Sequence, residues 1–173
     1  WFAEGSIELR RENTRNAIKS LEKGLSLDPE NASAYFQLGN AKIMQSEHKT
    51  ALISFIKASK IKPNFWQAVN NEGLVLYELG KKKKAIEAWE KAIQIKGDAE
   101  PKLALAVGLN KLKLDKSRSI LLATEALNDN PKYVSPVHQK EQLWGKKLRK
   151  DTKYLLQSKE LETAVKKALA NTN

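Results

Sequence analysis

Small and apolar residues recur every three or four positions over much of the chain, which is the spacing of one face of an α-helix. Residues 32–62 show the pattern best, and a polar stretch at 45–48 interrupts it. Pro63 follows directly, and proline cannot continue a helix interior because it lacks the backbone N–H. The pattern therefore predicts a helix, a turn and a second helix that ends near residue 62.

The same helix pair recurs at a constant interval, and Gly5, Gly39 and Gly73 mark three successive copies. Four further columns hold similar residues at this spacing: Ala17, Ala51, Ala85 and Ser119; Ile18, Leu52, Ile86 and Ile120; Gly24, Ala58, Ala92 and Ala126; Pro29, Pro63 and Pro131. A fixed period of about 34 residues is typical of stacked units that each bury an apolar face against the next. We expect four repeats and a segment outside the repeat, at 1–31, 32–65, 66–99, 100–133 and 134–173.

This set of columns resembles the tetratricopeptide repeat. In the second unit its slots are filled by Tyr35, Leu38, Gly39, Ala51, Phe55, Ala58 and Pro63. The resemblance covers residues 1–133 and implies an all-α fold, a right-handed superhelix (an α-solenoid) of about four helix pairs, to which we add two C-terminal helices. It also implies a concave groove, lined by the first helix of each pair, that binds other proteins. Because such repeats serve many unrelated partners, it predicts an interaction scaffold or assembly factor and names no partner.

The fourth unit and the segment after it depart from the repeat. Val107 occupies the glycine column and Gly108 follows one place late, which we interpret as a one-residue shortening between the two helices. Ser135 followed by Pro136 indicates a helix start, and the apolar spacing predicts one helix to about residue 157 and a last helix after it. We expect these two helices to cover the end of the core, with Trp144 buried against the second helix of the fourth unit. The stretch QLWGKKLRKDTKYLL resembles the tail of some cyanobacterial and chloroplast tetratricopeptide repeat proteins.

The chain is strongly basic, with a formal net charge of +11 and a pI of about 9.7. From residue 132 onward, ten lysines and arginines stand against four acidic residues. Such a patch suits an anionic partner, so the alternative function is an RNA- or anionic-surface-binding module. A solvated basic face without a partner explains the same charges. The candidate residues for an anionic partner are Lys146, Lys147, Arg149, Lys150 and Lys153.

The sequence carries no pattern of a catalytic or metal site. It has no cysteine, which excludes disulfides and thiolate chemistry and decides nothing about the redox compartment. Its two histidines, His48 and His138, lie far apart in the repeat order, and the glycines are scattered at repeat register and form no phosphate-binding loop. We therefore predict that the protein is not an enzyme and uses no metal and no cofactor.

The groove-facing positions of the first helices make the candidate binding surface. The residues that the resemblance places there are Phe36, Gln37, Asn40, Met44, Gln67, Asn70 and Asn71. Asparagine and glutamine both donate and accept hydrogen bonds, so they can hold a peptide backbone whatever its sequence. Phe36 and Met44 offer an adaptable apolar seat. We predict that a peptide or helix of another protein binds here, with the side chains of Asn40 and Asn71 pointing outward on one wall.

One known site of the family can be compared position by position. Chaperone-binding tetratricopeptide repeats hold a terminal carboxylate with two asparagines and several cations. Asn40 and Asn71 match the asparagines, but Phe36, Pro101 and Leu105 stand where cations are needed. The comparison predicts a protein or peptide ligand other than a terminal carboxylate, with nucleic acid or a membrane surface as the less favoured partners.

The sequence has no run of about eighteen apolar residues. We therefore expect no membrane span and favour a soluble, cytoplasmic chain. Trp1 falls in the same repeat column as Tyr35, which leaves the first three positions of that repeat absent. We expect the native protein to continue upstream, where a targeting or anchor segment would lie.

Overall fold

A computed structural model describes residues 1–172 of the chain, which over this range forms eleven α-helices and two short 3-10 helices and has no strand. The all-α prediction is confirmed. The first eight helices are α1 Phe2–Arg10, α2 Thr14–Leu27, α3 Ala32–Met44, α4 His48–Ile61, α5 Trp66–Glu78, α6 Lys82–Ile95, α7 Ala99–Lys111 and α8 Lys116–Asp129. The remaining elements, which we call the tail, are η1 Pro131–Val134, α9 Pro136–Glu141, α10 Lys146–Leu156, η2 Lys159–Leu161 and α11 Glu162–Ala170.

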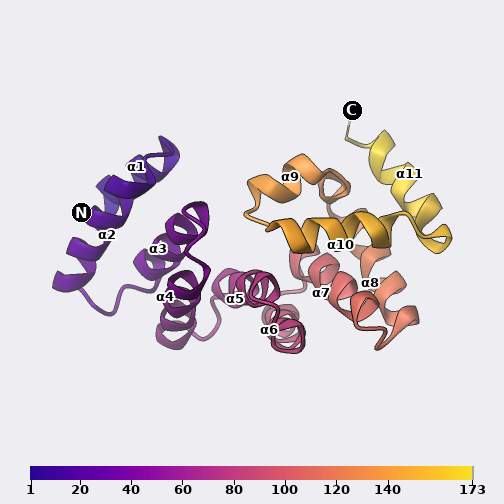
Figure 1. Cartoon of the computed structure of the whole chain (residues 1–173), viewed down its shortest axis with the longest axis horizontal. Helices are drawn as coiled ribbons and strands as arrows, with labels where there is room; N and C mark the ends of the chain where they lie inside the picture. Colours follow the sequence, from indigo (N-terminus) through magenta and orange to yellow (C-terminus); the bar gives the residue numbers. More distant parts are fainter. Residues whose placement is uncertain (173) are drawn as a thin grey trace.

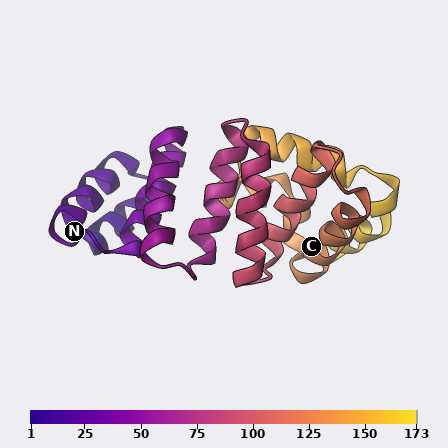
Figure 2. The same ribbon diagram turned by 90° about the horizontal axis from the view of Figure 1, so that it is seen from below.

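The first eight helices stack in chain order into an elongated solenoid of four helix pairs (Figure 1). Each helix packs against the next one along the chain, from α1 to α8. Figure 2 shows the stack from below, with the N-terminus at one end and the tail at the other. We call the surface formed by the first helices of the pairs, α1, α3, α5 and α7, the A-helix face.

The glycine column lets the two helices of a pair approach closely. A Cβ atom on Gly39 would meet the ring of Phe55, and a Cβ atom on Gly73 would meet the indole of Trp89. Both aromatic side chains are fully buried. In these two pairs the glycine of the first helix packs against the aromatic ring of the second helix. Only a residue without a side chain leaves room for the ring.

The turn inside each pair contains one left-handed residue, which fixes the register of the repeat. These residues are Glu12, Ser46, Gly80 and Lys113, with φ between +53° and +80°. The step from Gly80 to Lys113 is one position shorter than the step from Ser46 to Gly80, and the start of α7 is early by the same amount. Three residues connect α6 to α7 where four connect α4 to α5, so the missing residue lies before α7.

The expected shortening inside the fourth pair is therefore wrong. Four residues join α7 to α8, one more than join α5 to α6. Ala106 stands seven positions before the left-handed Lys113, as Gly73 stands before Gly80, so Ala106 and not Val107 takes the glycine column. Gly108 instead faces Ile86 of the preceding helix, at 2.9 Å from where its Cβ would lie. The absence of a side chain at Gly108 therefore lets α6 and α7 pack closely.

The tail does not begin with one long helix. Four residues separate α9 from α10, and Leu143 among them has φ of +65°. The carboxylate of Glu78, on α5, then accepts hydrogen bonds from the backbone N–H groups of Lys147 (3.2 Å) and Leu148 (2.9 Å). A carboxylate at a helix N-terminus satisfies free N–H groups and favours the helix dipole. The expected single helix over 136–157 is wrong because a side chain from the solenoid stabilises a second helix start.

The tail lies across the A-helix face of the C-terminal half. Helix α10 contacts α5 and α7, and α11 contacts α8 (Figure 1). Trp144 is buried, and its indole N–H donates to the Glu100 carboxyl of α7 at 2.9 Å. The expected burial of Trp144 is confirmed, and its polar partner lies on the first helix of the fourth pair.

Candidate functional site

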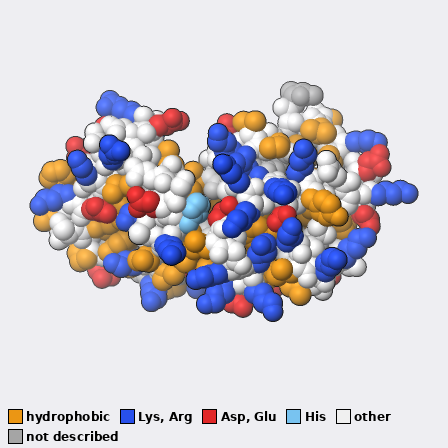
Figure 3. Space-filling view, viewed as in Figure 1, with side chains coloured by type: hydrophobic (Ala, Val, Ile, Leu, Met, Phe, Trp, Pro, Cys, Tyr) orange, Lys and Arg blue, Asp and Glu red, His pale blue; other side chains and the backbone are white. Residues whose placement is uncertain are grey.

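A hollow of about 350 Å³ lies on the A-helix face where α3, α5 and the start of α7 meet the tail. Its lining residues are Phe36, Asn40, Trp66, Gln67, Asn71, Asp98, Glu100, Tyr133, Glu141, Gln142 and Leu143. The space-filling view shows the surface notched between the N-terminal helices and the tail (Figure 3). Four of the seven predicted groove residues line this hollow, namely Phe36, Asn40, Gln67 and Asn71.

The side-chain amides of Asn70, Asn71 and Asn40 are hydrogen-bonded to one another in a row. Asn70 Nδ2 donates to Asn71 Oδ1 at 3.1 Å, and Asn71 Nδ2 donates to Asn40 Oδ1 at 3.0 Å. Asn70 is 0% exposed and Asn71 is 7% exposed, whereas Asn40 is partly exposed. The prediction that Asn71 points outward is wrong, and Asn70 offers no surface. A ligand can reach Asn40, because its side chain is partly exposed. Its Nδ2 also has no hydrogen-bond acceptor among the described residues, so it is free to donate to a ligand.

Asn70 is buried because the C-terminal half closes over it. The indole N–H of Trp89 donates to its backbone oxygen at 3.2 Å. Its Oδ1 atom is buried and has no hydrogen-bond donor within the described part of the chain. An unpaired buried acceptor of this kind costs free energy. The sequence pattern did not distinguish this buried position from the other predicted groove residues.

The other predicted groove residues divide between the hollow and its surroundings. Phe36 forms an apolar wall, with its ring centroid 5.0 Å from Phe65 and 5.8 Å from Phe55. Gln37 turns toward α1, where its Oε1 accepts a hydrogen bond from the Ser6 hydroxyl at 2.7 Å. Met44 is 42% exposed and lies outside the hollow. The hollow therefore contains four of the seven predicted groove residues, and Gln37, Met44 and Asn70 are not part of its lining.

One end of the hollow is acidic, which the sequence analysis missed. Glu100 is 9% exposed, and burial raises the pKa of its carboxyl to about 7, although hydrogen bonds from Trp144, Asn70 and Tyr133 oppose the shift. Asp98 caps α7, and its Oδ1 accepts from the backbone N–H of Glu100 at 3.5 Å. Glu141 reaches the same hollow from α9 with an exposed side chain.

The register explains why Glu100 was missed. Because the step from α5 to α7 is one position short, Glu100 is the counterpart of Gln67, whereas the full repeat period puts Pro101 there. The positions compared with the carboxylate clamp therefore become Glu100 and Ala104, neither of which is a cation. The carboxylate clamp lacks its cations in the corrected register as well.

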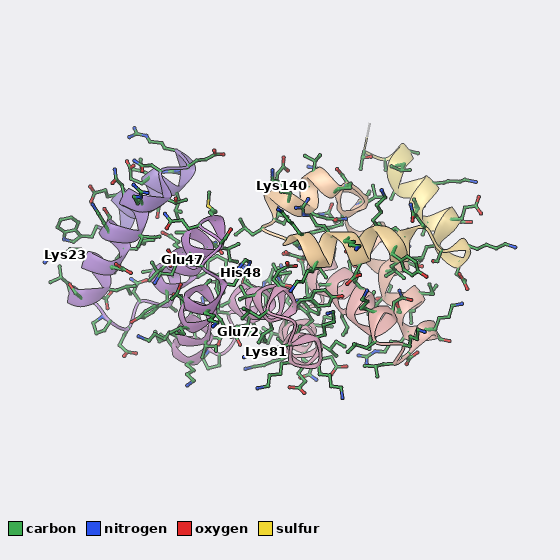
Figure 4. The ribbon with its side chains drawn as sticks, in the orientation of Figure 1. Lys23, Glu47, His48, Glu72, Lys81 and Lys140 are labelled. Carbon is green, nitrogen blue, oxygen red and sulfur yellow. The ribbon has the colours of Figure 1, made fainter. Side chains whose placement is uncertain are left out.

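Two of the five predicted anion-binding residues on α10 are bonded within the chain. Lys147 Nζ donates to the Glu78 backbone oxygen at 2.6 Å, and Arg149 Nε donates to the Trp144 backbone oxygen at 3.0 Å. Lys146, Lys150 and Lys153 are exposed. The side-chain view places Lys81 near α6 and Lys140 on α9, on separate parts of the surface (Figure 4). The anionic partner stays a prediction.

The histidines lie at separate places, as expected. His48 Nδ1 lies 3.0 Å from the Ser46 backbone oxygen in the α3–α4 turn, next to Glu47 (Figure 4). His138 packs edge-on against Tyr133, with ring centroids 4.8 Å apart. Across residues 1–172 there is no group of three or more histidine, cysteine or acidic side chains placed to hold a metal ion. None of the helices in that range is long and apolar enough to cross a membrane.

Comparisons with known proteins identify the repeats. A family model described as TPR repeat matches residues 5–46, and one described as tetratricopeptide repeat matches residues 66–99. Superkiller complex protein 3 from Mus musculus is 29% identical over 103 residues, which are 60% of this chain. Its Homo sapiens counterpart is 29% identical over 122 residues, or 70% of this chain. The matches span only 7% and 8% of those relatives.

Solved structures share the fold. A MamA structure is 29% identical with a TM-score of 0.68, covering 76% of this chain and 72% of that one. A second MamA structure covers 97% of this chain and 96% of its own, with a TM-score of 0.73 at 19% identity. The first TPR of RPAP3, solved bound to the HSP90 peptide SRMEEVD, has a TM-score of 0.63 at 18% identity and covers 65% of this chain and 90% of its own.

Proposed function

We propose, from the premise that this chain belongs to the tetratricopeptide repeat family, that it is a non-catalytic scaffold or assembly factor that binds a partner protein on its A-helix face. The ligand is a peptide segment of that partner, and the hollow between α3, α5, α7 and the tail is the centre of the site. The solved RPAP3 domain, whose own ligand is a peptide, supports a peptide-binding role for this fold.

The observation that carries the proposal is the composition of the hollow. Side chains from three successive first helices meet there and combine amides with aromatic rings. Asn40 presents a free Nδ2 donor that suits a peptide carbonyl, and Phe36 presents an apolar wall beside it. The tail covers α5 and α7 beyond the hollow, so a peptide would run along α1 and α3 and end against α9.

The test is site-specific photo-crosslinking. A photoreactive phenylalanine analogue at Phe36 is expected to cross-link the partner in extract from the native organism. The same analogue at Leu121, which is 58% exposed on α8 and away from the A-helix face, is the matched control. Adding Asn40→Ala should weaken capture about two- to tenfold, the loss expected for one hydrogen bond.

The outcome also separates the two candidate surfaces. Equal cross-linking from Phe36 and Leu121 would rule out the groove as the site. Loss of capture by charge reversal at Lys146 and Lys150, with Asn40→Ala having no effect, would favour the basic surface of α10 instead. A steep fall of binding with salt would accompany that second result, because phosphate contacts release counterions.

A further inference from the structure

The charge of the central hollow is opposite to that of the protein. The chain carries a formal net charge of +11. The hollow is nevertheless lined by three carboxyl groups, those of Asp98, Glu100 and Glu141, and no lysine or arginine of residues 1–172 lines it. Three other surface hollows each have at least one lysine or arginine in their lining. The acidic lining is therefore a local feature that the overall composition does not explain.

Aromatic rings stand beside these carboxyl groups. Trp66 and Tyr133 line the hollow together with Phe36. A carboxylate next to an aromatic face is the environment that stabilises an ammonium or guanidinium group, through charge-assisted hydrogen bonds and cation–π attraction. A neutral or anionic side chain gains neither interaction, and an anionic one is repelled.

The chain already places one cation at the rim of this environment. Lys96 Nζ lies 5.3 Å from the centroid of the Trp66 ring and 3.7 Å from the Asp98 carboxylate. Its side chain is 61% exposed and is not part of the lining. Lys96 thus balances part of the Asp98 charge from outside, and His138 lies 3.6 Å from Glu141. Among the described residues Glu100 has no basic side chain as a partner, since its hydrogen bonds come from Trp144, Asn70 and Tyr133.

One buried acceptor behind the hollow has no hydrogen-bond donor among the described residues. Behind Glu100 lies the side chain of Asn70, which is 0% exposed and whose Oδ1 has no donor among the described residues. A buried carboxyl beside an unpaired buried acceptor is a site with surplus acceptors. A ligand rich in N–H donors, such as a lysine or arginine side chain, complements the carboxyl groups of Asp98, Glu100 and Glu141 that line this end of the hollow.

We propose that this hollow is the specificity pocket of the site and takes a lysine or arginine side chain of the bound peptide. The inference rests on the proposed function, because it names the residue type that anchors the peptide in the same groove. Asn40 would hold a backbone carbonyl near the basic residue, while Asp98, Glu100 and Glu141 hold its charged group. The partner segment is accordingly basic at its centre, in contrast to the acidic peptide SRMEEVD bound by the RPAP3 domain.

The test uses the whole chain and defined peptide pools. Four pools of fluorescent nonapeptides, blocked at both ends and randomised at the flanks, carry lysine, arginine, norleucine or glutamate at the centre. Norleucine has the length of lysine without the charge. Fluorescence polarisation is expected to show tighter binding of the lysine and arginine pools than of the other two. Comparing lysine with arginine identifies which cation fits better.

A matched pair of variants connects the effect to the pocket. The pocket variant Asp98→Asn, Glu100→Gln, Glu141→Gln removes the three carboxyl groups and keeps side-chain size, the α7 cap and an acceptor for Trp144. The control variant Glu12→Gln, Glu30→Gln, Glu87→Gln removes three exposed charges outside the hollow. The pocket variant should bind the lysine and arginine pools about ten- to a hundredfold more weakly, as expected for charged hydrogen bonds. The control variant should bind them as wild type does.

The possible failures are distinguishable. Norleucine binding as tight as lysine binding, or equal losses in the two variants, would overturn the pocket inference and leave groove binding of peptides intact. Preferred binding of the glutamate pool would also overturn the pocket inference. Binding of no pool at all would count against the proposed function itself. A circular dichroism melt of each variant shows whether a loss of binding comes from unfolding.

Discussion

In the N-terminal half of the solenoid, α1–α4, the buried apolar residues form small clusters, the first of which contains Leu21, Leu25, Ala34 and Leu38. In the C-terminal half, α5–α11, one cluster of twenty buried residues extends from Leu74 to Leu161. The same repeat pattern builds both halves. The difference comes from the tail, which adds Tyr133, Trp144 and three leucines to the core and covers the first helices a second time.

The two halves differ in whether the outer apolar face of the first helices is covered. A helix pair buries one face against its neighbour, and its other apolar face needs a further cover. In the N-terminal half, Trp1 is 56% exposed and Ile7 is 39% exposed on α1 and just before it. In the C-terminal half the corresponding surface is covered by α10. The segment before α10, residues 141–143, forms one wall of the candidate site. The tail therefore has two roles in the C-terminal half: it covers the apolar surface of the first helices, and it forms part of the lining of the hollow.

The largest expected effect follows from Trp89→Ala. This side chain is fully buried between Gly73 and Tyr77, so truncation should lower the free energy of unfolding by about 3–5 kcal/mol. Urea unfolding followed by circular dichroism measures the change. Hydrogen exchange should show lost protection in α5–α8 and α10 before α1–α4. Lys83→Ala, an exposed residue on the same helix, should stay within about 0.5 kcal/mol, and equal effects of the two changes would contradict the assigned core.

A smaller effect is expected from Gly145→Ala. An added Cβ would collide with the carboxyl of Glu78, the group that caps α10. Displacing it should destabilise the protein by about 1–3 kcal/mol, as overpacking does, and should raise hydrogen exchange in α10. Gly97→Ala is the matched control, because its added Cβ would only contact Lys102 at 3.8 Å. If α10 exchanges as in wild type, the Glu78 contact does not hold the tail in place.

The third prediction concerns pH. The carboxyl of Glu100 has its pKa raised from 4.5 to about 7 by burial, with Asp98 adding to the rise. The folded state therefore binds this proton more tightly than the unfolded state, and the free energy of unfolding falls as pH rises from about 4.5 to about 7. Glu100→Gln cannot ionise and keeps an acceptor for Trp144. The variant should match the wild type near pH 4.5 and melt a few degrees higher at pH 8. A difference in melting temperature that does not change with pH would contradict the buried, protonatable state of Glu100.

The smallest effect is expected from Gly24→Ala in the N-terminal half. Alanine favours the helix by about 1 kcal/mol over glycine, but its Cβ would meet the ring of Phe2. Because Phe2 is only partly buried at the start of α1, it can move, and the net change should stay below about 1 kcal/mol. Gly73→Ala, against the fully buried Trp89, should cost more, about 1–3 kcal/mol. Similar costs at the two glycines, measured by urea unfolding, would show that the halves do not differ as described.

The sequence by itself determined the helix pairs and their packing rule. Small residues at the glycine column and bulky residues such as Phe55 and Trp89 follow each other in a fixed order, so the close helix contact is a local property that a single sequence displays. The helix start at Ser135 was also predicted, because capping depends on the residue at the helix end and its near neighbours. Part of the lining of the hollow was predicted from the repeat, because Phe36, Asn40 and Gln67 occupy groove-facing repeat positions.

Only the tertiary structure decided how the tail docks and what it does to the groove. The break between α9 and α10 depends on Glu78, which lies far earlier in the chain. The burial of Asn70 depends on Trp89 and on the closing of the C-terminal half, and the acidic end of the hollow depends on where the register changes before α7. These features arise from contacts between segments that are distant in sequence, and such contacts leave no periodic signal. The repeat is a local pattern, whereas the site is formed where the repeat ends and the tail folds back onto it.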